Sequence, residues 1–321
     1  MAFKKAEEIR MGAKFLNYGG TGSGKSTFAL SFPKIAAIDS EAGLSFYVGT
    51  EKGKNVEMIS QTQDFKELSD DLAAIMDSKP GEIQTLVIDS MTKIKENVEE
   101  VIMTVEEKKN KAKGKVAEEV SISQRAWGRV KYENGRIQNR QIDISSKGIH
   151  VVAIAQAKEK TRMVGDQMIV EGIIPDMKKQ SAYDYDVVLY SFTETDSNGE
   201  TKFLARVEKD RLGVFKIGDV IENASYEHWK DVLEKNSKNK VSEINFSKDV
   251  ESGMKAYEQE RDEEVKSIKE RITQLITELS DEHKERLKSD LKSARISGFD
   301  SLTVKQEEKV NELIEKYKEY I

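Results

Sequence analysis

One segment near the start of the chain constrains its fold more than any other. Residues 19–26 read Gly-Gly-Thr-Gly-Ser-Gly-Lys-Ser and match the pattern G-x-x-x-x-G-K-[ST]. The apolar residues 15–18 before it read as a strand, and residues 27–32 after it read as a helix, which is the context that a phosphate-binding loop needs. Glycines let such a loop curve so that successive backbone N–H groups face a phosphate. The sequence therefore predicts a nucleotide site at the end of a strand.

The loop also predicts individual contacts. The Lys25 ammonium would reach the β- and γ-phosphates, and the Ser26 hydroxyl would ligate Mg²⁺. Such a site needs a carboxylate on a neighbouring strand, and Asp89 ends the apolar run 85–89. We expect Asp89 to hold the metal through water. The residues expected to bind ATP are Gly19, Gly20, Thr21, Gly22, Ser23, Gly24, Lys25, Ser26 and Thr27.

Short apolar runs alternate with a helical pattern in the first half of the chain. Residues 35–38, 56–59, 85–89 and 150–155 are strand-like, and residues 65–76 have apolar side chains at helical spacing. Strands that alternate with helices favour a mostly parallel sheet covered by helices. The predicted fold class is therefore α/β.

The strand pattern changes after residue 185. Residues 186–193 and 202–207 are both strand-like, and Asn198-Gly199 between them favours a tight hairpin turn. We expect these strands to form an antiparallel hairpin at the edge of the sheet or just beyond its parallel part.

The composition shifts again at about residue 236. Residues 250–321 contain no proline and are dense in lysine and glutamate, with apolar residues at helical spacing. We expect two or three amphipathic helices there, with a loop at residues 297–300. The predicted domains are a core at 1–235 and a helical region at 236–321. That region is either an appendage packed on itself or a docking or oligomerisation arm, and it lacks the long heptad run of a coiled coil.

Composition excludes several classes of protein. The chain of 321 residues has no cysteine and three scattered histidines, which excludes a disulfide scaffold and argues against thiolate or histidine metal sites. Its 52 basic and 58 acidic side chains give a net charge of −6, so any contact with nucleic acid must be local. No apolar run approaches the ~20 residues of a membrane span, and the start lacks a signal-peptide pattern. We therefore expect a cytoplasmic protein that is not in a membrane.

Hydrolysis of ATP needs a group that polarises the attacking water. In many P-loop ATPases a glutamate directly follows the metal-binding aspartate, but Ser90 stands there in this chain. Glu41 remains as the candidate, because it lies just after the strand-like run that ends at Asp39.

Four segments, in this order, resemble the motifs of the RecA-like recombinase core. They are residues 19–26, 37–41, 86–89 and 152–156. The resemblance implies that Glu41 activates water and that Gln156 senses the γ-phosphate beside a DNA-contacting loop. It also implies that Lys209 and Arg211, in the second strand of the hairpin, reach the ATP of a neighbouring copy, where such cations can be worth ~10³–10⁵ in rate.

Within that family, residues 10–225 look most similar to phage-encoded RecA-like ATPases of the single-strand-annealing (Sak) type. This similarity implies an ATP- and Mg²⁺-dependent ATPase that forms rings or filaments of its own copies on single-stranded DNA. It would promote annealing or pairing of strands in phage recombination, in the cytoplasm of a bacterial host cell.

Two regions are candidates for DNA contact. Residues 105–140 carry a net charge of +5, with a basic tip at 108–115, and Trp127 and Tyr132 lie in the same stretch. We expect Trp127 to anchor its helix in the core rather than to stack on a base. The second region, residues 157–179, is mixed in charge, and residues 162–164 are expected to pair with 168–170 as a small hairpin around Gly165 and Asp166.

Two other functions stay open from the sequence. The first is a hexameric helicase or a loader-type DNA motor with the same core. The second is a nucleotide-gated adaptor without turnover, whose C-terminal helices recruit a replication partner or a single-stranded-DNA-binding protein.

Overall fold

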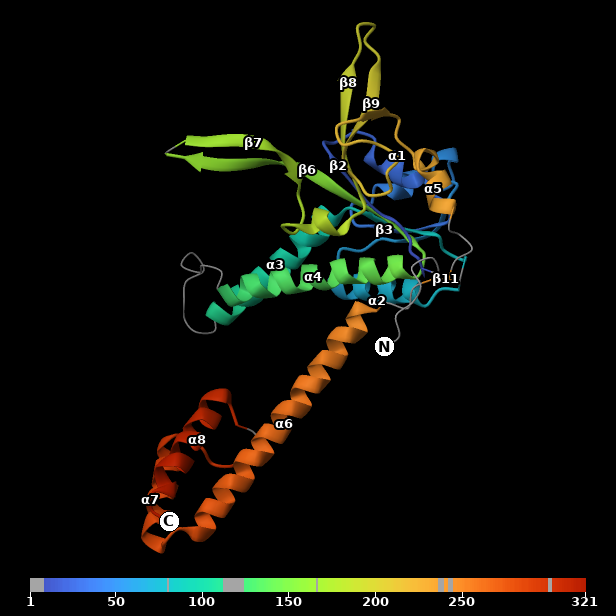
Figure 1. Cartoon of the computed structure of the whole chain (residues 1–321). Coiled ribbons are helices and arrows are strands. Elements are labelled where there is room, and N and C mark those ends of the chain that lie inside the picture. Colours follow the sequence, from blue (N-terminus) through green and yellow to red (C-terminus); the bar gives the residue numbers. More distant parts are fainter. Residues whose placement is uncertain are drawn as a thin grey trace. The chain divides into compact units, whose positions relative to one another are not determined.

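The structure is a computed structural model that describes residues 9–79, 81–111, 124–165, 167–235, 240–241, 245–299 and 302–321. These residues form two compact units, 1–247 and 248–321. The first unit contains a large sheet with the strand order β10-β9-β8-β2-β6-β5-β3-β4 (Figure 1). A separate pair, β1 (Ile9–Arg10) and β11 (Lys240–Val241), is parallel.

The parallel part of the sheet matches the predicted strands. Its members are β2 (Lys14–Gly19), β3 (Ile35–Asp39), β4 (Val56–Ser60), β5 (Thr85–Asp89), β6 (His150–Val164) and β8 (Val187–Thr195). Strand β6 lies between β2, which leads into the phosphate-binding loop, and β5, which ends at Asp89. The carboxyl ends of these strands share one edge, so the loop and Asp89 meet there.

Helices cover both faces of this sheet (Figure 1). One face packs on α2 (Phe65–Met76), α3 (Met91–Lys111) and α4 (Gln124–Ser146). The other packs on α1 (Lys25–Leu30), the turn η6 (Tyr226–His228) and α5 (Lys230–Glu234). The central strands are apolar on both sides because each side is buried. The prediction of an α/β core with a mostly parallel sheet, a phosphate-binding loop after its strand β2 and an antiparallel hairpin is confirmed.

The hairpin of β8 and β9 (Thr201–Asp210) is antiparallel, as predicted, and Gly199 turns it with a φ of 83°. Strand β8 also pairs in parallel with β2, so it belongs to the interior of the sheet. Strand β9 and the short β10 (Val220–Glu222) form the antiparallel edge.

Strand β6 continues beyond the sheet and pairs with β7 (Gln167–Pro175) as an antiparallel ribbon (Figure 1). The expected pairing of residues 162–164 with 168–170 is present within it, and Asp166 lies outside the described residues. Residues 150–155 of β6 are buried, whereas nearly all of 156–164 is exposed. Strand β6 therefore runs from the buried centre of the sheet into the exposed ribbon.

The expectation that Trp127 anchors its helix in the core is wrong, because its side chain is 48% exposed. The buried stripe of α4 runs through Ala126, Val130 and Ile137, and a residue next to Ala126 is turned about 100° away from it. Tyr132 is 54% exposed. Half of the basic tip, residues 112–115, lies outside the described residues.

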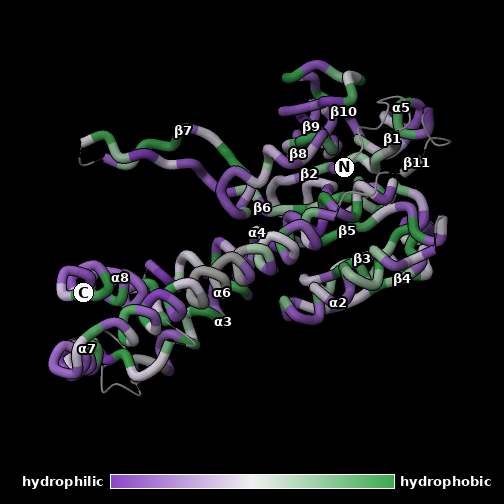
Figure 2. Tube along the Cα trace, turned by 60° about the horizontal axis from the view of Figure 1, so that its bottom comes forward, coloured by the Kyte–Doolittle hydropathy of each residue, from purple (hydrophilic) through white to green (hydrophobic). Residues whose placement is uncertain are grey.

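The second unit consists largely of three amphipathic helices in its described part, as the sequence predicts. They are α6 (Phe246–Glu278), which begins at the end of the first unit, α7 (Asp281–Ser293) and α8 (Val304–Lys318). Ile272, Leu287 and Val310 are among the side chains of its own apolar core. Ile276, one of the apolar residues of α6, is 36% exposed. Figure 2 shows the hydrophobic residues along β3 and β5 and the mixed pattern of these helices.

No helix in the described part of the chain is long and apolar enough to cross a membrane.

Candidate nucleotide-binding site

The phosphate-binding loop connects β2 to α1, and glycine is required at several of its positions for different reasons. Gly22 and Gly24 have φ angles of 73° and 87°, which side chains rarely adopt. A Cβ on Gly19 would lie 2.1 Å from the Ser191 carbonyl oxygen, so only glycine lets β2 run this close to β8. The backbone of the loop is therefore set by positions that exclude side chains.

Lys25 lies back over this loop. Its Nζ donates to the Gly20 carbonyl oxygen at 2.6 Å, and the Ser23 hydroxyl donates to the same oxygen at 2.8 Å. Burial lowers the pKa of Lys25, while the nearby carboxylates of Asp89 and Glu41 raise it. An ammonium held in this way can exchange a backbone oxygen for a phosphate oxygen.

Ser26 and Asp89 lie in direct contact. The Ser26 hydroxyl donates to Asp89 Oδ2 at 2.7 Å. Burial raises the pKa of Asp89 to about 6, against the hydrogen bond from Ser26, which lowers it. A buried carboxylate next to a hydroxyl offers the oxygen ligands that Mg²⁺ prefers, and a cation there would offset the cost of burying the charge.

The described residues contain no group of three or more His, Cys, Asp or Glu side chains that could hold a metal ion. A Mg²⁺ ion at Ser26 and Asp89 would therefore take its other ligands from phosphates and water, as this ion often does.

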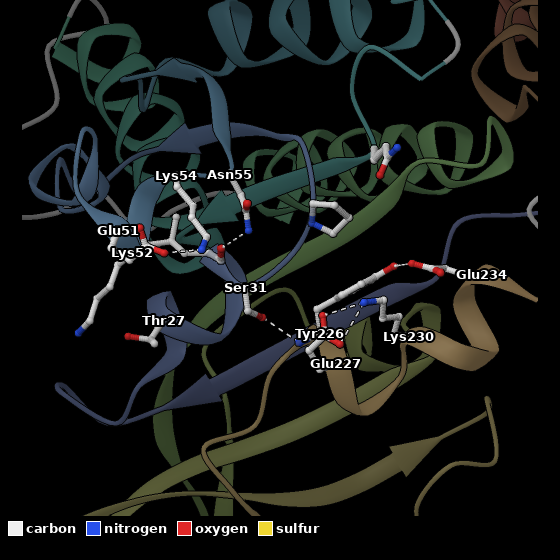
Figure 3. A pocket seen from close by; sticks show the side chains of 13 residues that line it. Thr27, Ser31, Glu51, Lys52, Lys54, Asn55, Tyr226, Glu227, Lys230 and Glu234 are labelled. Carbon is white, nitrogen blue, oxygen red and sulfur yellow. Dashed lines mark hydrogen bonds and ion pairs between the residues drawn. The ribbon is translucent and has the colours of Figure 1, made fainter.

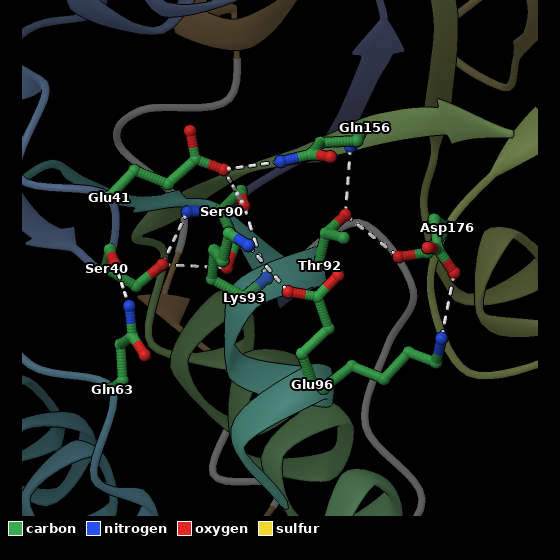
Figure 4. Close-up of polar contacts among 10 residues, drawn as sticks. Ser40, Glu41, Gln63, Ser90, Thr92, Lys93, Glu96, Gln156 and Asp176 are labelled. Atoms are coloured by element: carbon green, nitrogen blue, oxygen red, sulfur yellow. Dashed lines mark hydrogen bonds and ion pairs between the residues drawn. The ribbon is translucent and has the colours of Figure 1, made fainter. Parts of the chain in front are cut away.

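Glu41 and Gln156 come together above the end of the sheet (Figure 4). Glu41 Oε1 accepts from the Ser90 hydroxyl at 2.6 Å and from Gln156 Nε2 at 3.1 Å. The structure thus joins two residues that are 115 positions apart in the sequence.

Asp39 fixes the turn that carries Glu41, which the sequence reasoning missed. Its buried carboxylate accepts from the backbone N–H groups of Gly43, Leu44 and Ser45 at 2.9–3.3 Å. An aspartate at the end of a buried strand, followed by a glycine four residues later, was the available signal.

A closed set of hydrogen bonds ties Gln156 to the base of the ribbon (Figure 4). The Gln156 N–H donates to Thr92 Oγ1 at 2.9 Å, and the Thr92 hydroxyl donates to the Asp176 carbonyl oxygen at 2.9 Å. The Asp176 N–H donates back to the Gln156 carbonyl oxygen at 2.8 Å. Sequence reasoning did not indicate Thr92 or Asp176, because they meet only in the folded sheet.

Ion pairs strengthen this junction. The Asp176 carboxylate contacts Lys158 Nζ at 2.6 Å and Lys95 Nζ at 2.8 Å. Burial raises the pKa of Asp176 and the hydrogen bonds from the two lysines lower it, with a net lowering. The start of α3, where Lys95 lies, is therefore clamped to both strands of the ribbon.

Lys209 and Arg211 lie at the opposite end of the strands from the phosphate-binding loop. Lys209 pairs with Val188, near the start of β8. Measured along the neighbouring β2, this end of the sheet lies four residues before the phosphate-binding loop, a distance of ~13 Å. The structure does not bring these two cations to the loop of the same chain.

Both cations have partners where they lie. Lys209 Nζ donates to the carbonyl oxygens of Tyr183 at 2.9 Å and Tyr185, and Arg211 Nη1 lies 3.4 Å from Asp186 Oδ1. Burial, and then the nearby Arg211, lower the pKa of Lys209. Arg211 is the more exposed of the two and so the more accessible to a second molecule.

Comparisons with known proteins add the following. A family described as "AAA domain" matches residues 11–213. No curated protein matches the sequence. Among solved structures, the RadB recombinase is 18% identical over 67% of this chain and 87% of its own, with a TM-score of 0.41. The flagellar accessory protein FlaH from Methanocaldococcus jannaschii is 12% identical over 67% of this chain and 85% of its own, with a TM-score of 0.37.

Proposed function

Because the chain belongs to the AAA-domain family and its motifs resemble those of RecA-like ATPases, we propose that it uses ATP hydrolysis to act on single-stranded DNA. It would assemble with its own copies on the strand and promote annealing or pairing in phage recombination. The observation that carries this proposal is the contact between Gln156 and Glu41, since it links the nucleotide site to the ribbon through a single side chain.

The residues divide the chemistry between them. Lys25 and the loop backbone bind the phosphates, Ser26 and Asp89 hold Mg²⁺, which shields phosphate charge when bound, and Glu41 orients the attacking water. Gln156 exchanges its bond to Glu41 for one to a γ-phosphate oxygen. Glu41 is thereby freed for water at the moment when the substrate is in place.

The same exchange reaches the ribbon. Gln156 is bonded through its backbone to Thr92 and Asp176, so a shift of its strand end moves the base of β6 and β7. The ribbon carries Lys160 and Arg162, both of which lie within 3 Å of Glu171. Basic side chains that exchange an intramolecular carboxylate for a phosphate would bind a DNA backbone.

The exposed aromatics of α4 supply a second contact. Trp127 and Tyr132 are about half exposed, and Arg125, Arg129 and Lys131 are exposed around them. Aromatic side chains among cations bind single strands by stacking on bases while the cations neutralise phosphates. This combination favours single-stranded DNA over duplex DNA as the partner.

The test is the ATPase rate with and without single-stranded DNA over a range of protein concentrations. We expect DNA to stimulate turnover and the rate per molecule to rise with concentration, because the active form is an assembly. Lys25→Ala should abolish turnover at every concentration, since the phosphates lose their main cation. That variant is the control for contaminating ATPases.

Other outcomes would replace the proposal. Unwinding of a forked duplex without strand annealing would identify a DNA motor. Tight binding of ATP with negligible turnover, even with DNA present, would identify an adaptor, for which the second unit with its own core is the candidate docking module.

A further inference from the structure

A hollow of about 280 Å³ lies beside the phosphate-binding loop, between α1 and the β8–β9 hairpin. Ser23, Gly24 and Thr27 line one side, and Ser191 and Phe203 line the other. It shares Thr27, Ser31 and Lys52 with a larger hollow of about 540 Å³ farther along α1, where these three residues are labelled in Figure 3. We call the smaller one the α1 pocket.

The floor of the α1 pocket contains an unpartnered polar group. Asn17 is 1% exposed, and the Ser191 hydroxyl donates to its Oδ1 at 2.6 Å. Asn17 Nδ2 has no hydrogen-bond partner among the described residues. Ser191 can bond only one of the two amide atoms, so one of them is free whichever way the amide is turned. Buried polar groups are nearly always paired, and one left free in the wall of a pocket is available to a ligand that enters it.

An aromatic ring forms the wall of the pocket nearest the loop. Phe203 is 41% exposed, and its Cδ1 lies 3.4 Å from the point where a Cβ on Gly24 would stand. Phe203 pairs with Thr193 on β8, and the alternation of side chains puts it on the same face as Ser191. A partly exposed ring against a phosphate-binding turn offers a flat surface to a planar group.

The order of contacts along the loop gives the position of that planar group. Lys25 is expected at the β- and γ-phosphates and Ser26 at their Mg²⁺, so the α-phosphate falls next to Thr27, and the sugar and base lie beyond it. Thr27 is a lining residue of the α1 pocket. A pocket with an aromatic wall and a few polar groups at its floor is typical of small-molecule sites.

We propose that the α1 pocket receives the base of the nucleotide, a purine, which stacks on Phe203 and takes a hydrogen bond from the Asn17 amide. This inference rests on the proposed function, because it needs the loop to hold the phosphates. It names two specificity-determining residues that lie outside the phosphate-binding motif.

The experiment measures binding of ATP and of inorganic tripolyphosphate to the full chain by calorimetry in Mg²⁺. Phe203→Ala should weaken ATP about tenfold, which is the usual cost of losing one stacked base, and leave tripolyphosphate unchanged. The matched control is Phe192→Ala. Phe192 is on the neighbouring strand of the same hairpin, stacks on Tyr190, and points to the opposite face. The affinities for ATP and for tripolyphosphate should therefore both stay unchanged.

Asn17→Ser tests the floor of the pocket. It should change the ratio of ATP to GTP affinity, while tripolyphosphate binding, which needs only the loop, reports that the variant is folded. An unchanged ratio would remove Asn17 from the proposal.

The remaining outcomes separate the pocket from the function. Equal affinity of the wild type for ATP and tripolyphosphate, or equal losses of both in Phe203→Ala, would overturn the pocket and leave the phosphate site standing. Base-dependent binding without any turnover would overturn the ATPase proposal and leave the pocket standing.

Discussion

Asp89 is a carboxylate whose surroundings oppose its charge. Burial raises its pKa to about 6, well above the ordinary 3.8, whereas binding of Mg²⁺ needs the ionised form. Protons and the proposed Mg²⁺ ion would therefore compete for this residue near pH 6.

We predict that ATP affinity in Mg²⁺ falls by up to tenfold for each pH unit below about 6, because protonated Asp89 cannot support the metal. Calorimetric titrations from pH 5 to 8 measure this dependence. Affinity that stays flat down to pH 5 would contradict it. Asp89→Asn should bind weakly at every pH and lose the dependence.

The same variant has an expected effect on stability. A carboxyl group whose folded pKa is raised stabilises the fold only while protonated, so its contribution is present below pH 3.8 and is lost as the pH rises through about 6. The asparagine side chain carries no charge at any of these pH values. Asp89→Asn should therefore raise the free energy of unfolding above pH 6 by up to about 3 kcal/mol, which denaturant titrations of both proteins at pH 5 and pH 8 would measure. An equal difference at the two pH values would contradict this assignment.

At the scale of elements, strand β6 decides how the nucleotide site and the ribbon are related. Its first half is buried between β2 and β5, and its second half is one side of the ribbon. Gln156 lies where these halves meet, and Thr92 on α3 bonds to its backbone there.

We predict that Thr92→Val lowers DNA-stimulated ATPase activity more than basal activity. Valine has nearly the same shape but no hydroxyl, so it breaks the link to Gln156 and Asp176 without leaving a cavity. The two rates, measured with and without single-stranded DNA, give the stimulation ratio. Thr92→Ser keeps the hydroxyl and is the matched control, and an equal loss of both rates would mean that Thr92 only supports the fold.

The elements differ in how far the sequence predicts them. Helix α2 was predicted with its observed bounds, and β3 and β5 closely, because continuous apolar runs and helical spacing are local signals. The place of β8 inside the sheet and the exposure of Trp127 were not predicted. They depend on which strands pair and on which side of a helix is covered, and both are set by distant segments.

The residues of the candidate site also differ in how far the sequence predicts them. Residues 19–26 form one contiguous motif, so their arrangement follows from the motif alone. Asp39, Thr92 and Asp176 act through hydrogen bonds that form only in the folded chain, and the α1 pocket joins Asn17 to Phe203 across a hairpin. No local pattern marks such contacts.

At the scale of the whole molecule, the phosphate-binding loop and Arg211 lie at opposite edges of one sheet. A group that cannot reach its own loop can complete a site only on another copy, in a head-to-tail interface. Arg211 now contacts Asp186 and would have to exchange it for the phosphates of the neighbour.

We predict that Lys25→Ala and Arg211→Ala are each nearly inactive alone but recover activity when mixed. In a random equal mixture, about a quarter of the sites combine an intact loop with an intact neighbouring arginine. ATPase rates of the mixture against the sum of the separate rates measure this. Arg206→Ala removes an exposed arginine of β9 that lies over the Tyr190 ring of β8, and this control should be active alone.

Absence of recovery would contradict the shared site, and normal turnover by a dilute monomeric Arg211→Ala protein would exclude it.

Because the loop and the arginine are far apart in one copy, the number of complete sites would depend on whether the assembly is open or closed. Where a neighbour's arginine completes each site, as proposed, an open chain of n copies has one terminal loop without a neighbour, so n − 1 sites would be complete. In a closed ring all n are complete. A short open assembly then loses a larger fraction of its turnover than a long one. The turnover per copy therefore reports whether the assembly has closed or how long it has grown.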